Sequence, residues 1–409
     1  MSKSSEIQSL LEKLTLDEKA QLCSGSDFWH LHGIEHLDLP SIMVTDGPHG
    51  LRKQSEEADH IGLAESVAAT CFPTASGLAA TWNIDLIKKV GVTLAKECRT
   101  EQVSVILGPG VNIKRHPLGG RNFEYFSEDP FLTGKLASGL IEGIQSEGIG
   151  TSIKHFAVNN HETGRMVVDA IVDERTLREI YLPGFEIPIK ESQPWTVMCS
   201  YNKVDGTYLS ENHRLLTEIL RDEWGFDGIV MTDWGAANER IEGIKAGLDL
   251  EMPASGRLNT DRIIKAVQSG ELSYDKLDAC VTRLLALIIK SRRLLNDNHQ
   301  HSANEHHQVA KLAALEACVL LKNEQQNLPL SISDKVGVIG ALAKDTRYQG
   351  SGSSQINPTH LDQPLEAISL LNAGVEYVPG YKLKGATPKS FIDDAIALAE
   401  NMDKIILIV

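Results

Sequence analysis

The sequence predicts an α/β fold: a TIM-like barrel of the (β/α)8 type followed by a partial α/β-sandwich domain. Between residues 40 and 255, short apolar runs alternate with stretches whose apolar residues recur every three or four positions, which is the pattern of strands and amphipathic helices. The strand-like runs show little polar alternation, as expected of parallel strands buried on both faces. A second alternation of strands and helices starts near Lys335 and predicts the second domain.

Six strands are recognisable in the first part of the chain, fewer than the eight of a complete barrel, so the barrel is expected to be irregular or incomplete. The predicted strands are Ser41–Thr45, Val103–Leu107, Gly150–Phe156, Trp195–Ser200, Gly228–Thr232 and Leu248–Met252. The predicted helices are Asp85–Glu101, Asp129–Glu147, Glu174–Glu191 and one or two over Asp261–Leu295.

A polar break at residues 296–302 marks the expected exit from the barrel. We therefore predict a barrel over 1–295, a linker with a connecting helix (Asn304–Asn323) over 296–334, and a partial sandwich over 335–409. The last segment should hold strands at Lys335–Gly340, Val375–Val378 and Lys404–Val409, with helices at Pro364–Asn372 and Lys389–Asn401. Two helices leave parts of such a sheet uncovered, so a truncated domain is expected. It would aggregate, form homo-oligomers or need a complementing C-terminal polypeptide.

Charge and composition exclude several kinds of partner. The net charge of −15 argues against nucleic acid or an anionic membrane surface, because both need a basic face. It suits a neutral small molecule. Residues 1–6 lack the apolar core of a secretory signal, and no run approaches the ~20 apolar residues of a membrane span. These features predict a cytoplasmic protein.

No metal and no nucleotide cofactor is expected. The cysteines at 23, 71, 98, 199, 280 and 318 lack CxxC or Cys/His spacing and are predicted to be free thiols. Histidines 299, 301, 306 and 307 gather among polar linker residues, and a solvated surface is the preferred interpretation. Neither the glycine-rich run after Leu107 nor residues 336–340 has the GxGxxG or GxxxxGK[ST] spacing of a phosphate loop.

The most informative run is Gly228–Gly235, in which an apolar strand ends in Asp233 and Trp234. In barrels of alternating strands and helices, catalytic groups lie at the carboxyl ends of the strands. A carboxylate beside an indole suits a nucleophile that attacks a sugar, since the C–H faces of sugars pack on aromatic rings. The alternative for Asp233 is a helix N-cap or turn residue.

Polar groups also follow the first two predicted strands. Asp46 and Arg52 follow the first, and a carboxylate there can accept hydrogen bonds from two neighbouring sugar hydroxyls. The alternative is an Asp-Gly-Pro turn with a solvated arginine. Arg121 follows two glycines that permit close approach to a ligand. Ion pairing and helix capping are the preferred roles of the nearby acids Glu124, Glu128 and Asp129.

Lys154 and His155 are adjacent at the end of the third strand. Neighbouring strand residues point to opposite faces, so both can serve one site only if the backbone is distorted. A buried lysine is costly unless paired, which favours a functional role. Tyr201, after the fourth strand, can hold the Asp233 carboxylate and lower its pKa; an ordinary rim tyrosine is the alternative. Together these groups predict a pocket for a polyhydroxylated neutral molecule.

The motifs resemble the N-terminal barrel of family-three glycoside hydrolases, the β-glucosidase and β-xylosidase group. They are TDGPHGLR, GPGVNIKRHPLGGRNFEYFSEDP, KHFAVNNHETGR, VDERTLREIYLPGFE, MCSYNKVDGTYLSEN, GIVMTDWGA and AGLDLEMP. VLLKNEQQNLPL and GSGSS resemble the start of that family's second, α/β-sandwich domain, so the resemblance covers essentially the whole chain. The run KHFAVNNHETG departs from the KHFPGHG-like motif of the hexosaminidase branch and disfavours that branch.

The resemblance implies a retaining hydrolase that releases terminal non-reducing β-D-glucosyl residues through a covalent intermediate on Asp233. A β-xylosidase, a β-N-acetylhexosaminidase and a non-catalytic sugar-binding remnant are the alternatives. A serine of residues 350–354 is implied to reach over from the second domain. The implied substrate-binding residues are Asp46, Arg52, Arg121, Lys154, His155, Arg165, Met198, Tyr201, Trp234 and Ser353.

One part of the family pattern has no counterpart in the sequence. In the glucosidase branch the acid/base is a glutamate in a run resembling ESEGFDR, shortly after a strand like Lys404–Val409. Retaining hydrolysis needs this group about 5–5.5 Å from the nucleophile. The acid/base is therefore expected beyond residue 409, and activity is expected to be impaired in the 409 residues alone. Should it lie within them, Glu162 and Glu128 are the first candidates.

Overall fold

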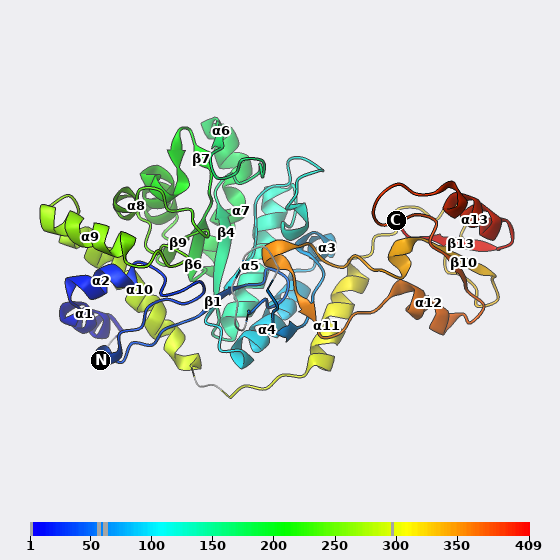
Figure 1. The fold of residues 1–409 in the computed structure, drawn as a ribbon, viewed down its shortest axis with the longest axis horizontal. Coiled ribbons are helices and arrows are strands. Elements are labelled where there is room, and N and C mark those ends of the chain that lie inside the picture. Colours follow the sequence, from blue (N-terminus) through cyan, green and yellow to red (C-terminus); the bar gives the residue numbers. More distant parts are fainter. Residues whose placement is uncertain (1–2, 55–58, 60–63, 296–297) are drawn as a thin grey trace. The chain divides into compact units, whose positions relative to one another are not determined.

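The computed structural model describes residues 3–54, 59, 64–295 and 298–409. The chain forms two compact units (Figure 1): Met1–Cys318 with Gln349–Thr359, and Val319–Tyr348 with His360–Val409. This division differs from the predicted boundaries. Helix α11 (Ala303–Glu316), expected in a linker, packs on helix α4 (Ile84–Thr100) of the first unit.

A five-stranded parallel sheet, in the order β1-β3-β4-β6-β9, forms the centre of the first unit. Every residue of these strands is buried, which fits the lack of regular polar alternation in their sequences. The predicted α/β class is confirmed. The strands are β1 (Val44–Asp46), β3 (Val105–Leu107), β4 (Gly150–Phe156), β6 (Thr196–Cys199) and β9 (Ile229–Thr232).

Helices α4, α5 and α7 pack against one another in sequence order. The predicted helix Glu174–Glu191 is present as three consecutive segments, α6, η3 and α7, and the predicted helix Asn304–Asn323 ends at Glu316. Residues 317–321 are all apolar and have no polar face to turn to solvent. Apart from short 3-10 turns, the other helices of the first unit in the described residues are α1 (Lys3–Lys13), α2 (Leu16–Leu22), α3 (Ala75–Ala80), α5 (Pro130–Ser146), α6 (Glu174–Thr176), η3 (Leu177–Tyr181), α7 (Pro183–Ser192), η5 (Arg214–Glu223), α8 (Arg240–Ala246), α9 (Leu258–Ser269) and α10 (Tyr274–Ser291).

The predicted strand Leu248–Met252 is not a regular strand. Single parallel bridges pair Leu250 with Met231 of β9 and Glu251 with Ser24. Antiparallel bridges then pair Gly25 with Leu31 and His30 with Met43, just before β1. Backbone hydrogen bonding therefore runs from β9 back to β1 through irregular segments, and we call residues 248–252 the closing segment.

Buried charged groups fix the closing segment, which has no regular hydrogen-bond ladder. The Asp249 side chain has no exposed surface and accepts hydrogen bonds from Arg221 Nη2 (2.7 Å), Arg283 Nη2 (2.7 Å) and the Val230 N–H (2.8 Å). The buried Arg240 donates from Nη2 to the carbonyls of Cys23 (2.9 Å) and Asp249 (2.8 Å). The closing segment is thereby fixed to η5, α8 and α10.

A short strap, residues 349–359, leaves the second unit and packs with the first. Its strand β11 (Asn357–Pro358) pairs in parallel with β2 (Ala68–Ala69). The Gln349 side chain closes the strap on itself through the Ile356 carbonyl (2.9 Å) and N–H (2.6 Å). A second small sheet of the first unit contains β5 (Asp169–Ala170), β7 (Lys203–Val204) and β8 (Thr207–Tyr208).

The second unit is a three-stranded parallel sheet in the order β12-β10-β13. Its central strand is buried, but Ile405 and Leu407 of β13 are 39% and 62% exposed, in keeping with the predicted uncovered faces. Across the described ranges, no helix is both long and apolar enough to cross a bilayer. The elements of this unit are β10 (Val336–Ile339), α12 (Pro364–Leu371), β12 (Glu376–Val378), α13 (Lys389–Glu400) and β13 (Lys404–Leu407).

We expect Asp249→Asn to lower the free energy of unfolding of the first unit by roughly 3–5 kcal/mol, because it leaves the partly buried Arg221 and Arg283 without their carboxylate. Urea unfolding followed by circular dichroism measures this loss. The matched control is Asp261→Asn, which disturbs an exposed pair with Arg257 and should change stability by less than about 1 kcal/mol. Equal losses in the two variants would contradict the role given to Asp249.

Candidate active site

The predicted site residues gather at the carboxyl ends of the central strands. Asp46 ends β1, Lys154 and His155 lie in β4, Tyr201 follows β6, and Asp233 follows β9. Since all five strands are parallel (Figure 1), these ends lie at one edge of the sheet. Each of these residues is at most 9% exposed. The arrangement therefore concentrates buried polar and charged groups in one place.

Both hydrogen bonds to the Asp233 carboxylate go to the same oxygen. The Tyr201 hydroxyl lies 3.0 Å from Oδ1 and 3.0 Å from the Trp234 carbonyl, so these two acceptors share its proton, and the Trp234 N–H donates to Oδ1 over 2.8 Å. Burial and the neighbouring carboxylate raise the pKa of Tyr201, so the hydroxyl keeps its proton and remains a donor. The second oxygen, Oδ2, lies 3.6 Å from His155 Nε2. This leaves Oδ2 as the less engaged oxygen.

The contacts of His155 determine its tautomer. Arg121 Nη2, which is always a donor, lies 2.9 Å from His155 Nε2, so Nε2 must accept and carries no proton. Nδ1 then carries the proton and donates to the Tyr125 hydroxyl at 3.1 Å. Burial and the charges of Arg121 and Lys154 hold the pKa of His155 well below its usual range. The ring is neutral and forms no ion pair with Asp233.

The backbone distortion expected at Lys154 and His155 is present. The pairing register of β4 with β6 shifts between Ile153 and Phe156. Asn112 holds the irregular segment, because its side chain donates to the His155 carbonyl (3.0 Å) and accepts from the His155 N–H (2.8 Å). The sequence had singled out the distortion, but it did not identify Asn112 or Tyr125 as its supports.

Asp46 and Arg52 form a buried ion pair, with Arg52 Nη1 3.1 Å from Asp46 Oδ2. Arg52 is 1% exposed, so the solvated arginine of the alternative interpretation is wrong. Burial is the largest cause that raises the pKa of Asp46, to about 6. Lys154 and Arg52 oppose this rise, while Asp233 and Glu124 add to it. The four neighbouring charges show that Asp46 and Asp233 belong to one electrostatic cluster.

Arg121 and Glu124 form a close ion pair beside His155. The ion pairing predicted for Glu124 is therefore present. Burial alone would raise the pKa of Glu124, but Arg121 and Lys154 outweigh it and lower that pKa. Burial also opposes the charge of Arg121, yet its acidic neighbours raise its pKa well above the usual value. Asp129 caps α5 by accepting from the Leu132 N–H, which fits the predicted capping.

Aromatic rings and an arginine surround this cluster. The Trp234 ring packs 5.2 Å from Trp29, and its Nε1–H donates to the Phe28 carbonyl (3.0 Å). Arg165 stacks 4.8 Å from the centre of the Tyr201 ring and pairs with Glu162 (3.0 Å). The sequence did not mark Phe28 or Trp29, which lie before the first predicted strand.

The two remaining predicted residues are less directly placed. Met198 is buried in β6, three positions before Tyr201 along the chain. Ser353 is half-buried in the short turn η8 (Gly352–Ser354) of the strap. The strap approaches the Arg121 loop closely, since a Cβ on Gly350 would lie 2.2 Å from the Phe123 ring. Glycine is therefore required at position 350.

The cysteines and the linker histidines have different outcomes. All six cysteines are free thiols, as predicted. The solvated-surface interpretation is wrong for His306, which is 5% exposed and bonds through Nδ1 to Glu97 (2.7 Å). The chain folds this part of the predicted linker onto α4, which the polar neighbours of His306 in sequence did not reveal.

Comparison with known proteins identifies relatives over the whole chain. Residues 47–287 match the model of the glycosyl hydrolase family 3 N terminal domain, and residues 318–409 match that of the glycosyl hydrolase family 3 C-terminal domain. The thermostable beta-glucosidase B of Acetivibrio thermocellus is 51% identical over 402 residues, covering 97% of this chain and 53% of the relative. An exo-alpha-(1->6)-L-arabinopyranosidase of Bifidobacterium longum is 48% identical over 410 residues, covering 97% and 54%.

Solved structures are similar in fold. A beta-glucosidase of Bifidobacterium adolescentis superposes with a TM-score of 0.91 at 46% identity, covering 97% of this chain and 57% of that one. Beta-glucosidase 3B from Thermotoga neapolitana, in complex with glycerol, has a TM-score of 0.90 at 37% identity, covering 99% and 62%. The chain spans about half the length of the curated relatives it matches.

The raised pKa of Asp46 predicts a pH-dependent effect of Asp46→Asn on stability. A folded-state pKa of about 6, above the unfolded value of about 3.9, means that protonation favours folding. This contribution is complete below the unfolded pKa and is lost as the pH rises through 6. The Asn variant cannot ionise, so its stability relative to wild type should increase by about 2–3 kcal/mol between pH 4 and 7.

Urea unfolding at several pH values measures the difference between the two proteins. Asp275→Asn, at an exposed position, is the matched control. The assignment fails if Asp46→Asn follows the same pH dependence as this control.

Proposed function

We propose, since this chain belongs to glycosyl hydrolase family 3, that the intact protein is a retaining glycoside hydrolase releasing terminal non-reducing β-D-glucosyl residues. One observation carries the proposal: the buried Asp233 carboxylate has one oxygen held by two donors and the other turned to a neutral histidine. The names of the relatives from Acetivibrio and Bifidobacterium adolescentis support the glucoside as substrate.

Asp233 is the proposed nucleophile. Tyr201 and the Trp234 N–H orient the carboxylate through Oδ1, so Oδ2 is placed to attack the anomeric carbon. The bond from that carbon to the leaving-group oxygen breaks, and a glycosyl ester forms on Asp233. Water then cleaves the ester and restores the carboxylate. The two donors stabilise the negative charge that returns to Asp233 in this second step.

The surrounding groups are proposed to bind the sugar. Asp46 can accept hydrogen bonds from hydroxyls, and the buried Lys154 beside it can donate. Arg121 is held by Glu124 and His155 and can donate to a further hydroxyl. The rings of Trp234 and Trp29 give an apolar wall for the C–H face of the sugar. We propose Arg52, Arg165, Met198 and Ser353 as the rest of the subsite.

The general acid/base is proposed to be a glutamate of the family's second domain that is not among these 409 residues. The lengths of the curated relatives support this, because the chain covers 53% and 54% of them. Two acids of the candidate site, Glu124 and Glu162, already pair with arginines. Glu124 has a lowered pKa beside Arg121, which is unsuitable for a proton donor, and Glu162 pairs with Arg165.

An α-L-arabinopyranosidase is the second candidate. Its support is the 48% identity to the enzyme of that name from Bifidobacterium longum. An α-L-arabinopyranoside shares an equatorial anomeric bond with a β-D-glucoside, but it lacks C6 and has an axial 4-hydroxyl. Groups that contact positions 4 and 6 of the sugar would therefore separate the two substrates.

The setting of the enzyme is also proposed. Six free cysteines, four of them buried, fit a reducing compartment such as the cytoplasm. The exposed Ile405 and Leu407 of β13 support the docking of further polypeptide on the second unit.

We expect Asp233→Ala, in a protein extended through the rest of the family's second domain, to lower hydrolysis of an aryl β-glucoside by on the order of 10³-fold or more. The reason is loss of the attacking oxygen. Asp227→Ala, at an exposed position before the same strand, is the control. Azide should restore turnover in Asp233→Ala by displacing the aryl alcohol, and the product should be a glycosyl azide of inverted configuration. Activity of Asp233→Ala within a few-fold of wild type would sink the assignment.

The 409-residue chain is a second arm of the same experiment. It should hydrolyse the glucoside weakly. Azide or formate should accelerate its turnover of substrates that have good leaving groups, because small anions attack the glycosyl ester without a general base. Full activity from this chain would place the acid/base within it and direct mutagenesis to Glu162 and Glu128.

The substrate preference is tested by kcat/KM on aryl glycosides with the same leaving group. We expect the β-D-glucoside to exceed the β-D-xyloside and the α-L-arabinopyranoside by about 10-fold or more, since contacts to C6 are worth about 1–3 kcal/mol. A higher value for the arabinopyranoside would establish the second candidate instead. A preference for the N-acetylglucosaminide would place the chain in the hexosaminidase branch.

A further inference from the structure

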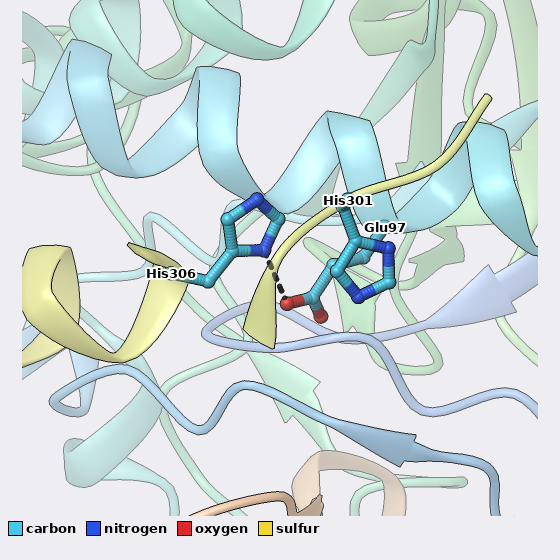
Figure 2. Close-up of side chains that lie close together, drawn as sticks. All are labelled: Glu97, His301 and His306. Carbon is cyan, nitrogen blue, oxygen red and sulfur yellow. Dashed lines mark hydrogen bonds and ion pairs between the residues drawn. The ribbon is translucent and has the colours of Figure 1, made fainter. Parts of the chain in front are cut away.

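A glutamate and two histidines, far apart in sequence, meet between α4 and the start of α11 (Figure 2). Glu97 lies in α4, His301 precedes α11, and His306 lies near the start of α11. One ligand atom from each lies within 4.8 Å of the other two. Glu97 and His306 are 1% and 5% exposed. None of the three is at a strand end, so this cluster is separate from the Asp233 site.

The hydrogen bonds around His301 leave one of its ring nitrogens available as a ligand. The Thr100 hydroxyl lies 3.1 Å from the Lys96 carbonyl, 3.2 Å from the His299 carbonyl and 3.0 Å from His301 Nδ1. Its single proton is needed by the carbonyls, so the hydroxyl accepts from His301 Nδ1–H. The proton of the neutral ring is therefore on Nδ1, and Nε2 has a free lone pair. A hydrogen bond of this kind orients metal-binding histidines.

The other two side chains are also oriented. Glu97 accepts from the Thr70 N–H through both carboxylate oxygens, at 3.1 and 3.3 Å, which fixes the carboxylate. His306 Nδ1 lies 2.7 Å from Glu97 Oε1. The rings of His301 and His306 stack with their centres 4.8 Å apart. Two imidazoles and a carboxylate thus face a common point, as Figure 2 shows.

We propose that Glu97, His301 and His306 bind a divalent transition-metal ion, with zinc as the best match. Imidazole nitrogen and carboxylate oxygen form three-ligand zinc sites in which water takes the fourth position. In a tetrahedral site, ligand atoms about 2.0–2.1 Å from the ion are about 3.4 Å apart. The three ligand atoms here lie within 4.8 Å of one another, so the widest pair needs to close by at most about 1.5 Å. Rotation of the two rings out of their stack supplies this movement.

The ion would join three parts of the first unit. Glu97 belongs to α4, Thr70 N–H fixes it to the segment after β2, and both histidines follow the barrel helices in the chain. A metal here ties α11 to α4 and takes no part in glycoside cleavage. Removing it should lower thermal stability and leave the chemistry at Asp233 intact.

The test is zinc binding by the 409-residue chain, measured by equilibrium dialysis against chelator-buffered Zn²⁺ with metal analysis. Wild type should retain about one ion per chain, and Co²⁺ in its place should give visible absorption of a tetrahedral or five-coordinate site. His301→Ala and Glu97→Gln should weaken binding by on the order of 100-fold or more, because changes in the outer shell alone cost about 10–100-fold. His213→Ala, at a surface histidine, should bind as wild type does.

Thr100→Ala separates a metal site from a cluster that serves packing alone, because only a metal site predicts a change in zinc affinity for this variant. It removes the acceptor of His301 Nδ1–H without touching a ligand, and it should weaken zinc binding by about 10-fold or more. Circular dichroism confirms that each variant is folded. Absence of zinc retention by wild type at micromolar free Zn²⁺, or equal retention by wild type and His301→Ala, would overturn the proposal and leave an ordinary hydrogen bond between Glu97 and His306.

Discussion

Two arginines from different helices converge on Asp249, a carboxylate with no exposed surface. Because an unpaired charge at this depth is costly, the closing segment can occupy only the position in which all partners meet. The residues that follow then bond to the end of β9: Thr232 N–H donates to the Leu250 carbonyl (2.9 Å), and Met252 N–H donates to Thr232 Oγ1 (2.8 Å). Asp233 follows Thr232 directly in the chain. The position of the proposed nucleophile thus depends on two ion pairs whose members are not among the candidate site residues.

The candidate site combines cations and anions at a density that burial alone would forbid. Arg121, Lys154 and Arg52 balance Glu124, Asp46 and Asp233, and each charge has an opposite neighbour. His155 contributes no charge to this balance, because its donor Arg121 leaves Nε2 unprotonated. A neutral ring beside Asp233 leaves the negative charge of the carboxylate uncompensated by the ring, whereas a protonated imidazole at that distance would attract it.

The sequence predicted the five central strands to within a few residues, because strands buried on both faces are rich in apolar residues and lack regular polar alternation. Leu248–Met252 was also predicted as a strand, but it makes only single bridges, to Met231 and Ser24, and its position depends on Asp249. Such long-range partners are invisible in a linear pattern. The same limit applies to the site: strand-end residues were predicted, whereas Tyr125 and Asn112 act through tertiary contacts. His306 was interpreted as solvated because its partner, Glu97, is 209 positions away.

The strap makes the two units dependent on each other through connectivity alone. Residues 319–348 leave the first unit and residues 349–359 return to it, after which the chain departs again. While the second unit is unfolded, docking of the strap must close a flexible loop formed by residues 319–348. The effective concentration of the strap at the first unit is then low. Once β10 and its neighbours fold, the ends of this loop are held by a compact body. Folding of the small unit therefore raises the local concentration of the strap at the first unit, so the docking of Ser353 depends on the folding of a sheet to which it does not belong.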